Sequence, residues 1–335
     1  MKKKVKIIAE AGCNHNGSIK LAYKMIDEAK KAKADAVKFQ LYSTEHLVTQ
    51  KAKKAKYALL NTSKKQTQYQ MQKKLEFSEQ IHKKLKRYCE QKKIEYMCSA
   101  FDVPSIKVLN QLNLKVFKVP SGEINNFPYL KYLGSLNKKI ILSTGMSKLS
   151  EINEAMKTLI RSGTKKNNII ILQCNSEYPS PYSDINLRAM VKLGNKYRIN
   201  FGLSDHSLGI EVPVAAVALG AKIIEKHFTL NKNYNGPDHK ASLLPFELKN
   251  MVKAIRNIEL AMGSDKKFVT KSEKKNINVA RKSVVAIKLI KKGDIFNTKN
   301  IGIKRPGNGI SPSKYYNLLG KKSKKRFQID DLIRL

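Results

Sequence analysis

Eight short apolar runs alternate with amphipathic segments, and this alternation predicts an α/β fold of the (β/α)₈, or TIM barrel, type. Each run is nearly continuous in apolar character, as expected for a strand of a parallel sheet that is buried on both faces. Most runs are followed by a helical pattern, and eight such units fit a closed barrel better than an open sheet. The runs comprise residues 5–10, 36–40, 94–99, 115–119, 139–144, 168–174, 200–204 and 221–228.

A change of composition near residue 264 divides the chain. Residues 1–263 are predicted to form the barrel, and a periodic helix over 246–262 closes it. Residues 264–281 are charged and are predicted to be a linker. Residues 282–335 consist of short apolar pieces broken by Gly, Pro, Asn and Asp, which predicts a small second domain. A unit of this size is marginal alone, so we expect it to pack against something larger.

Within the barrel, residues 41–77 form a long polar insertion after the second strand that is rich in Lys and Gln. Loops of this length inside a compact domain are usually functional, so we interpret the insertion as an active-site loop or lid.

The net charge of the chain is +40, from 66 Lys and Arg against 26 Asp and Glu. Such an excess is compatible with binding of nucleic acid or with steering of an anionic substrate. The lysines are spread along the whole chain and form no basic block interleaved with aromatic residues. We therefore expect solvated lysines and no nucleic-acid partner.

No apolar run approaches the roughly 20 residues that span a bilayer. Lys6 and Glu10 interrupt the first apolar stretch, which argues against a signal peptide. The four cysteines, Cys13, Cys89, Cys98 and Cys174, form no CxxC pair and have no zinc-like spacing. Free thiols in a reducing cytoplasm are the expected state, with no membrane association.

Polar side chains occur at the end of every predicted strand. In a barrel, the chemistry takes place at the carboxyl ends of the strands, so these residues are expected to surround one mouth. Lysines and hydroxyl groups suit a phosphate, whereas carboxylates and amides suit a polyol. The set comprises Glu10, Lys38, Gln40, Ser99, Lys118, Ser121, Glu123, Ser143, Ser176, Tyr178, Ser204, His206, Glu225 and His227.

His206 and His227 follow or end neighbouring strands and can share one divalent ion, leaving coordination positions for water or substrate. The alternative is a pair of hydrogen-bonded core histidines. Lys118 fits an anion clamp together with Lys38, or a Schiff-base nucleophile. Arg305 lies in a Pro- and Gly-rich loop, where it could present a guanidinium to an anion or polyol or be one of a solvated basic pair with Lys304.

Several stretches in the correct order resemble the sialic acid synthase family over nearly the whole chain. They are IIAEAGCNHNGS, VKFQ, FKVPSGE, ILSTGMS, LQCNSEYPSP, GLSDHSLG, GAKIIEKHFTL, GPDHKAS and KRPGNGISP. The resemblance implies a (β/α)₈ barrel followed by a small domain similar to type III antifreeze proteins, an antifreeze-like (SAF) domain. It also implies a homodimer in which this domain is swapped and covers the partner's active site.

The resemblance further implies a condensation of phosphoenolpyruvate with an open-chain N-acylated mannosamine-type sugar. The products would be phosphate and a nine-carbon 2-keto acid. The main expectation is N-acetylmannosamine as the sugar, which makes the chain an N-acetylneuraminate synthase. The alternative is 2,4-diacetamido-2,4,6-trideoxymannose, which makes it an N,N'-diacetyllegionaminate synthase. A Schiff-base aldolase that uses Lys118 is a further alternative.

The resemblance also implies roles for individual residues. Ser176 and Gln173 depart from the family, since some members have Asn and many have His at the respective positions, so details of the phosphate contacts are open. Catalysis is expected from Glu10, Glu123, Lys38 and Lys118; phosphoenolpyruvate binding from Lys38, Ser99, Lys118, Ser121, Ser143, Ser176 and Ser204; sugar binding from Gln40, Glu123, Tyr178, Asp238 and the partner-derived Arg305; and binding of Mn²⁺ or Mg²⁺ from His206 and His227.

Overall fold

The computed structural model describes residues 4–63 and 65–335. The chain forms two compact units, Met1–Gly263 and Ser264–Leu335, which are described separately. In the described part of the chain, no helix has both the length and the apolar character needed to cross a membrane.

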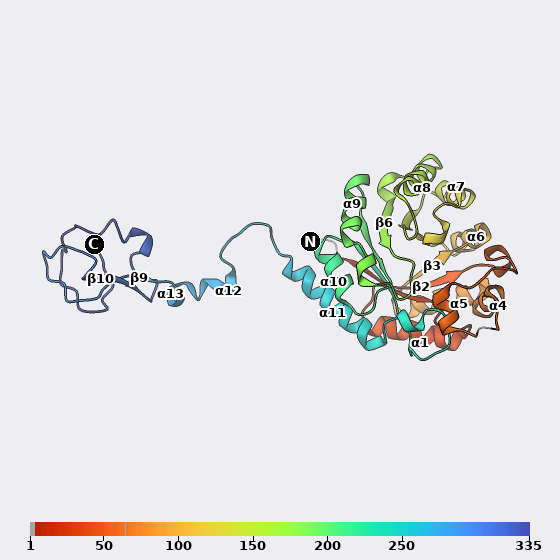
Figure 1. Cartoon of the computed structure of the whole chain (residues 1–335), viewed down its shortest axis with the longest axis horizontal. Coiled ribbons are helices and arrows are strands. Elements are labelled where there is room, and N and C mark those ends of the chain that lie inside the picture. Colours follow the sequence, from red (N-terminus) through yellow and green to blue (C-terminus); the bar gives the residue numbers. More distant parts are fainter. Residues whose placement is uncertain (1–3, 64) are drawn as a thin grey trace. The chain divides into compact units, whose positions relative to one another are not determined.

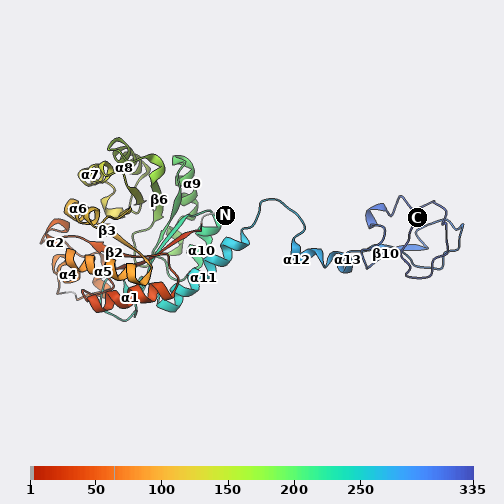
Figure 2. The same ribbon diagram turned by 180° about the vertical axis from the view of Figure 1, so that it is seen from behind.

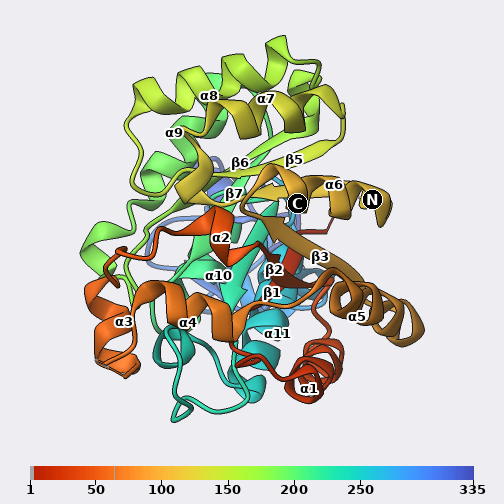
Figure 3. The same ribbon diagram turned by 90° about the vertical axis from the view of Figure 1, so that its right-hand side faces the viewer.

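The first unit is a closed barrel of eight parallel strands, in which each strand pairs with the next and β8 pairs with β1 (Figure 3). The predicted fold is confirmed, and every predicted strand agrees with the structure to within two residues at each end. The strands are β1 (Lys6–Gly12), β2 (Ala36–Leu41), β3 (Glu95–Ala100), β4 (Val116–Val119), β5 (Lys139–Ser143), β6 (Ile169–Cys174), β7 (Phe201–Asp205) and β8 (Ile223–His227).

Helices surround the strands on all sides (Figure 1). Side chains cap the starts of several of these helices; for example, the Asp102 carboxylate accepts a hydrogen bond from the Ser105 amide at the start of the helix Val103–Gln111. Their apolar faces pack on the outward side chains of the strands and form the main core. The surrounding helices are α1 (Ile19–Lys31), α5 (Glu79–Lys92), α6 (Val103–Gln111), α7 (Phe127–Ser135), α8 (Leu149–Arg161), α9 (Leu187–Tyr197), α10 (Glu211–Ala218) and α11 (Pro245–Ala261).

The interior of the barrel is divided into an apolar layer and a polar layer. Side chains two residues apart on a strand point to the same face, so both layers come from the same strands. The apolar layer is formed by Ile8, Ala36, Met97, Ile141, Leu172 and Ile223. Two residues further along each of these strands, and one layer closer to the carboxyl ends, lie Glu10, Lys38, Ser99, Ser143, Cys174 and Glu225.

The insertion after β2 is more ordered than a loop. It contains three short helices, α2 (Thr44–Leu47), α3 (Lys56–Asn61) and α4 (Gln68–Leu75), at one end of the barrel (Figures 2 and 3). Its residue 64 lies outside the described residues. Asn61 attaches the insertion to the loop after β8, because its carbonyl accepts from the Gly236 amide at 3.2 Å and its side chain donates to the Pro237 carbonyl at 3.3 Å.

The second unit has a small core of its own. Strands β9 (Ser283–Ala286) and β10 (Ile301–Lys304) pair antiparallel and enclose buried side chains that include Val284, Phe296 and Phe327. The predicted linker over 264–281 contains two short exposed helices, α12 (Lys271–Lys274) and α13 (Ile277–Ala280).

Three histidines of the first unit are buried as neutral side chains. Burial lowers the pKa of His15 to about 3 and the pKa values of His82 and His239 to about 4. His82 is held by a contact of 2.7 Å between its Nδ1 atom and the Tyr96 hydroxyl. In the unfolded chain an imidazole binds a proton near pH 6.5, so the unfolded state gains protons first as the pH falls.

We therefore expect His82 alone to cost the fold about 2 kcal/mol between pH 7 and pH 5. Replacing it by Gln keeps a partner for the Tyr96 hydroxyl and removes the titration, so the His82→Gln variant should lose less stability over this interval than the wild type. Urea unfolding at pH 7 and pH 5 measures the difference. Exposed His46 provides the control: His46→Gln should follow the wild type, and equal losses in His82→Gln and the wild type would contradict the prediction.

Candidate active site

A cavity of about 350 Å³ opens at the carboxyl ends of the barrel strands. It is lined by thirteen of the fifteen site residues predicted from the sequence. These are Glu10, Lys38, Gln40, Ser99, Lys118, Ser121, Ser143, Ser176, Tyr178, Ser204, His206, His227 and Asp238.

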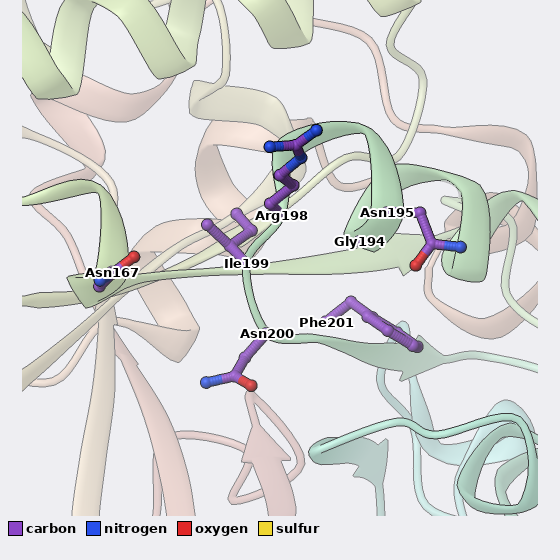
Figure 4. Close-up of a pocket in the computed structure, with 7 residues that line it drawn as sticks. All are labelled: Asn167, Gly194, Asn195, Arg198, Ile199, Asn200 and Phe201. Carbon is purple, nitrogen blue, oxygen red and sulfur yellow. The ribbon is translucent and has the colours of Figure 1, made fainter.

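A second hollow, of about 450 Å³, lies beside the amino-terminal ends of β6 and β7 (Figure 4). Its polar side chains do not converge, since Arg198 and Asn200 extend in different directions. Chemistry in barrels takes place at the opposite mouth, and we therefore place the candidate active site in the smaller cavity.

Two lysines and two glutamates form a buried network at the floor of the cavity. The Nζ atom of Lys38 lies 2.8 Å from Glu10 Oε2 and 3.7 Å from Glu225 Oε2, and it donates a hydrogen bond of 2.8 Å to the Ser99 hydroxyl. Lys118 lies 3.2 Å from Glu225 Oε1. Four charges that are removed from water compensate one another, so the loss of any one of them leaves an unpaired buried charge.

The two carboxyl groups of the network have very different pKa values. Burial raises the pKa of Glu10 to about 7, although Lys38 opposes the shift. Burial acts on Glu225 in the same direction, but Lys118 and Lys38 outweigh it and lower its pKa to about 2. Glu225 is therefore ionised at neutral pH, while Glu10 can both give and take a proton. Carboxylates whose pKa values are separated in this way are suited to different catalytic roles.

Further hydroxyl groups line the same cavity, around Gly145. The Gly145 amide donates to the Ser121 hydroxyl at 2.9 Å, and a Cβ atom at Gly145 would lie 2.3 Å from the Ser176 hydroxyl. The Ser143 hydroxyl is buried and has no partner among the described residues. Hydroxyl donors beside two ammonium groups form a cradle for an anion.

The two cavity histidines lie next to each other. The ring centroids of His206 and His227 are 5.3 Å apart, and Tyr178 stacks on His206 at 4.0 Å. The Nδ1 atom of His206 lies 2.5 Å from the Asn175 carbonyl, which can only accept, so this nitrogen carries a proton and Nε2 is the atom that can bind a metal. Burial lowers the pKa of His206, but Cys174 and the Asn175 carbonyl outweigh it and the net shift is upward, so a bound cation would replace a proton on Nε2.

His227 is in the neutral form that a metal requires. Burial lowers the pKa of His227 well below its usual value, and His206 adds to this shift, so the ring is neutral. Its Nδ1 atom is buried without a hydrogen-bond partner and lies 3.7 Å from the Asp238 carboxylate. In the chain as described, no three His, Cys, Asp or Glu residues form a ready-made metal cluster. The residues present therefore fit an ion held by two imidazoles with other positions open.

Glu225 and Lys226 precede His227 on β8, and their side chains point to opposite faces of the strand. Glu225 shares the cavity face of β8 with His227, whereas Lys226 faces outward and is fully buried. The Nζ atom of Lys226 lies 2.5 Å from Asp205 Oδ2 and donates to the Ser207 carbonyl at 2.6 Å. This ion pair joins β7 to β8 directly beside the two histidines.

Two predicted residues are not among those that line the cavity. Glu123 is half-buried, and its carboxylate accepts a hydrogen bond from Asn126 at 2.7 Å. Arg305 belongs to the second unit, where it is exposed.

Conversely, Glu225, Cys13 and Cys174 line the cavity without a predicted role. Glu225 was predicted at the mouth, from its place two residues before His227, and only a role for it was missing. Nothing in the sequence distinguished the two cysteines from core residues.

The fold and the cavity together define a class: a barrel enzyme whose polar mouth combines an anion cradle with two imidazoles. A model of the NeuB family matches residues 25–267, and a model of the SAF domain matches residues 281–335. The chain belongs to the NeuB family, and the predicted membership in the sialic acid synthases and the predicted antifreeze-like domain are confirmed.

Relatives match over almost the full length of the chain. It is 51% identical to the N,N'-diacetyllegionaminic acid synthase of Campylobacter jejuni, over 99% of both chains. It is 37% identical to the human N-acetylneuraminate-9-phosphate synthase, over 98% of this chain and 90% of the relative. The crystal structure of the N-acetylneuraminic acid synthetase of Leptospira borgpetersenii superimposes with a TM-score of 0.73 at 36% identity, covering 82% of this chain and 90% of that one.

Proposed function

We propose that this protein condenses phosphoenolpyruvate with an N-acylated mannosamine-type sugar and releases phosphate. The observation that carries the proposal is the convergence of Lys38, Lys118 and the hydroxyl cradle in one cavity with His206 and His227. The cradle suits the phosphate and carboxylate of an enol ester, and the same cavity offers Gln40, Tyr178 and Asp238 to a polyol.

For the sugar, we propose 2,4-diacetamido-2,4,6-trideoxymannose, the alternative that the sequence suggested beside N-acetylmannosamine. The support comes from the relatives named N,N'-diacetyllegionaminic acid synthase, which are 51% and 42% identical to this chain. The human N-acetylneuraminate-9-phosphate synthase is 37% identical, and a pseudaminic acid synthase of Campylobacter jejuni is 36% identical.

The chain's own residues would bind and orient both substrates. Lys38 and Lys118 neutralise the anion while the serine hydroxyls fix its oxygens, so that positioning and charge complementarity lower the barrier. A divalent ion, Mn²⁺ or Mg²⁺, would be held by His206 and His227 and would act as a Lewis acid on the sugar aldehyde.

In the reaction, the methylene carbon of phosphoenolpyruvate forms a bond to the aldehyde carbon, and the aldehyde oxygen gains a proton. Positive charge develops at the carbon that bears the phosphate, and water adds there and releases one proton, which balances the proton gained by the aldehyde oxygen. The resulting tetrahedral species loses phosphate when its C–O bond breaks, and the remaining hydroxyl loses its proton to give the keto group. With a pKa of about 7, Glu10 is suited to exchange these protons.

The direct test is release of inorganic phosphate by the purified enzyme with phosphoenolpyruvate, Mn²⁺ and each of the two sugars in turn. We expect release to depend on the sugar and to be faster with the diacetamido sugar. Burial lowers the pKa of Lys118, which also suits a Schiff-base nucleophile. If borohydride trapped a pyruvate adduct on Lys118 and no phosphate were released, the protein would instead be a Schiff-base aldolase.

We further propose that the enzyme is a homodimer in which Arg305 of one subunit reaches the sugar in the active site of the other. Exposure of Arg305 and the small core of its domain support this arrangement. The expected location is the cytoplasm, which stays a prediction.

Loss of the guanidinium should weaken sugar use more than phosphoenolpyruvate use. We expect Arg305→Ala to raise the KM for the sugar about tenfold, because a charge-assisted hydrogen bond is lost. Steady-state kinetics with both substrates varied measures this, and Arg326→Ala, at an exposed position of the same domain, is the matched control.

A mixing experiment tests the swap itself. Mixed dimers of Arg305→Ala and His227→Ala subunits contain one site with both residues intact only if Arg305 acts on the partner. Such mixtures should regain the wild-type KM for the sugar at part of the wild-type rate. Mixtures that show no such recovery would contradict the swapped arrangement.

A further inference from the structure

Part of the cavity is covered by the insertion after β2, and we call this part the roof. It is formed by Ala55, Tyr57, Ala58, Gln68, Met71 and Gln72. One edge of the roof lies near the histidines, because the ring of Tyr57 lies 4.9 Å from that of Tyr178, which in turn stacks on His206. The attachment of Asn61 to the loop after β8 holds the same segment in place.

One polar atom of the roof is left without a partner. The Oε1 atom of Gln68 is buried and accepts no hydrogen bond from the described residues. Gln68 is the first residue of α4, and the start of this helix is fixed by a capping box between Thr67 and Gln70. A buried carbonyl oxygen without a donor is unfavourable, and a ligand that brings a donor removes this cost.

The apolar residues that line the cavity together with Gln68 indicate the kind of ligand group. Ala58 and Met71 are buried apolar residues of the roof, and Ala55 adds a further apolar side chain to the cavity wall. A group that fits an amide oxygen beside apolar walls needs an N–H or O–H donor together with a methyl group. An acetamido group has both, whereas a hydroxyl group has only the donor.

The position of the reacting aldehyde indicates which acetamido group is concerned. If C1 of the sugar lies beside the histidines, the substituent on C2 stays near the strand ends. The substituent on C4 is two carbons further away and extends toward the roof. We propose that Gln68, Ala58 and Met71 form a specificity subsite for the acetamido group on C4 of the acceptor sugar. This inference rests on the proposed function.

The test compares two sugars that differ only at C4: 2,4-diacetamido-2,4,6-trideoxymannose and 2-acetamido-2,6-dideoxymannose, in which a hydroxyl replaces the second acetamido group. Wild-type enzyme should prefer the first sugar by about tenfold or more in kcat/KM. Gln68→Met has a similar length and no hydrogen-bonding atoms, so it should reduce this preference about tenfold, through KM and with kcat little changed. Gln66→Met makes the same change in the insertion outside this cavity and should keep the wild-type preference.

The C4 assignment would be overturned if Gln68→Met lost activity equally with both sugars. It would also be overturned if the variant kept full activity with both. Calorimetric binding of the two sugars gives the same ratio if turnover of the hydroxyl analogue is too slow to measure. If the proposed function itself were wrong, the result would be different, because the wild-type enzyme would release no phosphate with either sugar. Phosphate release by the wild type together with an unchanged preference in Gln68→Met contradicts the subsite alone.

Discussion

Replacing His227 with alanine is expected to reduce metal-supported phosphate release by about 1,000-fold or more. The imidazole of His227 is neutral and buried, and its Nδ1 atom has no hydrogen-bond partner in the described structure. In the variant, only one of the two imidazoles, that of His206, would remain to hold the ion. Lewis-acid activation of an aldehyde contributes several kcal/mol, and each 1.36 kcal/mol is tenfold in rate.

Two measurements keep this result interpretable. Titration of the variant with Mn²⁺ should show weaker binding than the wild type, independently of turnover. His46→Ala, at an exposed position, should bind the ion and turn over like the wild type. If His227→Ala released phosphate at the full rate in excess chelator, the ion would have no place in the reaction.

The second large effect is expected at Lys38. This ammonium group lies 2.8 Å from Glu10 and 3.7 Å from Glu225, and all three side chains are buried. The Lys38→Met variant leaves the carboxylates with Lys118 as their remaining cation, so we expect the free energy of unfolding to fall by about 3–5 kcal/mol. Urea unfolding measures the loss, and the KM for phosphoenolpyruvate should rise as well.

A double variant separates the charge effect from the loss of packing. Glu10→Gln removes one of the two carboxylates, so adding it to Lys38→Met should restore part of the lost stability without restoring phosphoenolpyruvate binding. A double variant whose losses are the sum of the two single losses would show that the ion pair is not coupled.

The strands were predictable from the sequence because each is buried on both faces and reads as one apolar run. The site was predictable for the same reason, since a polar residue at the end of such a run stands out. Lys38, Ser99 and His227 are examples. Glu225 stands out equally, but its ion pairs with both lysines depend on the closure of the barrel, which the sequence does not display.

The insertion was the least predictable part. Its composition is polar, and the short helices α2, α3 and α4 are too brief to give a clear period of 3.6 residues. The burial of Gln68 Oε1 depends on how the insertion folds over the cavity, which its sequence does not display. Glu123 was predicted wrongly in the other direction. Its place after the fourth strand indicated that it lines the cavity, but its carboxylate instead accepts a hydrogen bond from Asn126 in the local turn.

The layered interior of the barrel restricts where this protein can change during evolution. Lengthening or shortening any strand by one residue would turn the inward side chains beyond that point outward, and would replace the polar side chains of the cavity by apolar ones. One-residue insertions and deletions within these strands should therefore be absent from functional homologues. The roof carries no such alternation, so new acceptor preferences can arise there, one substitution at a time, while the condensing chemistry below is inherited intact.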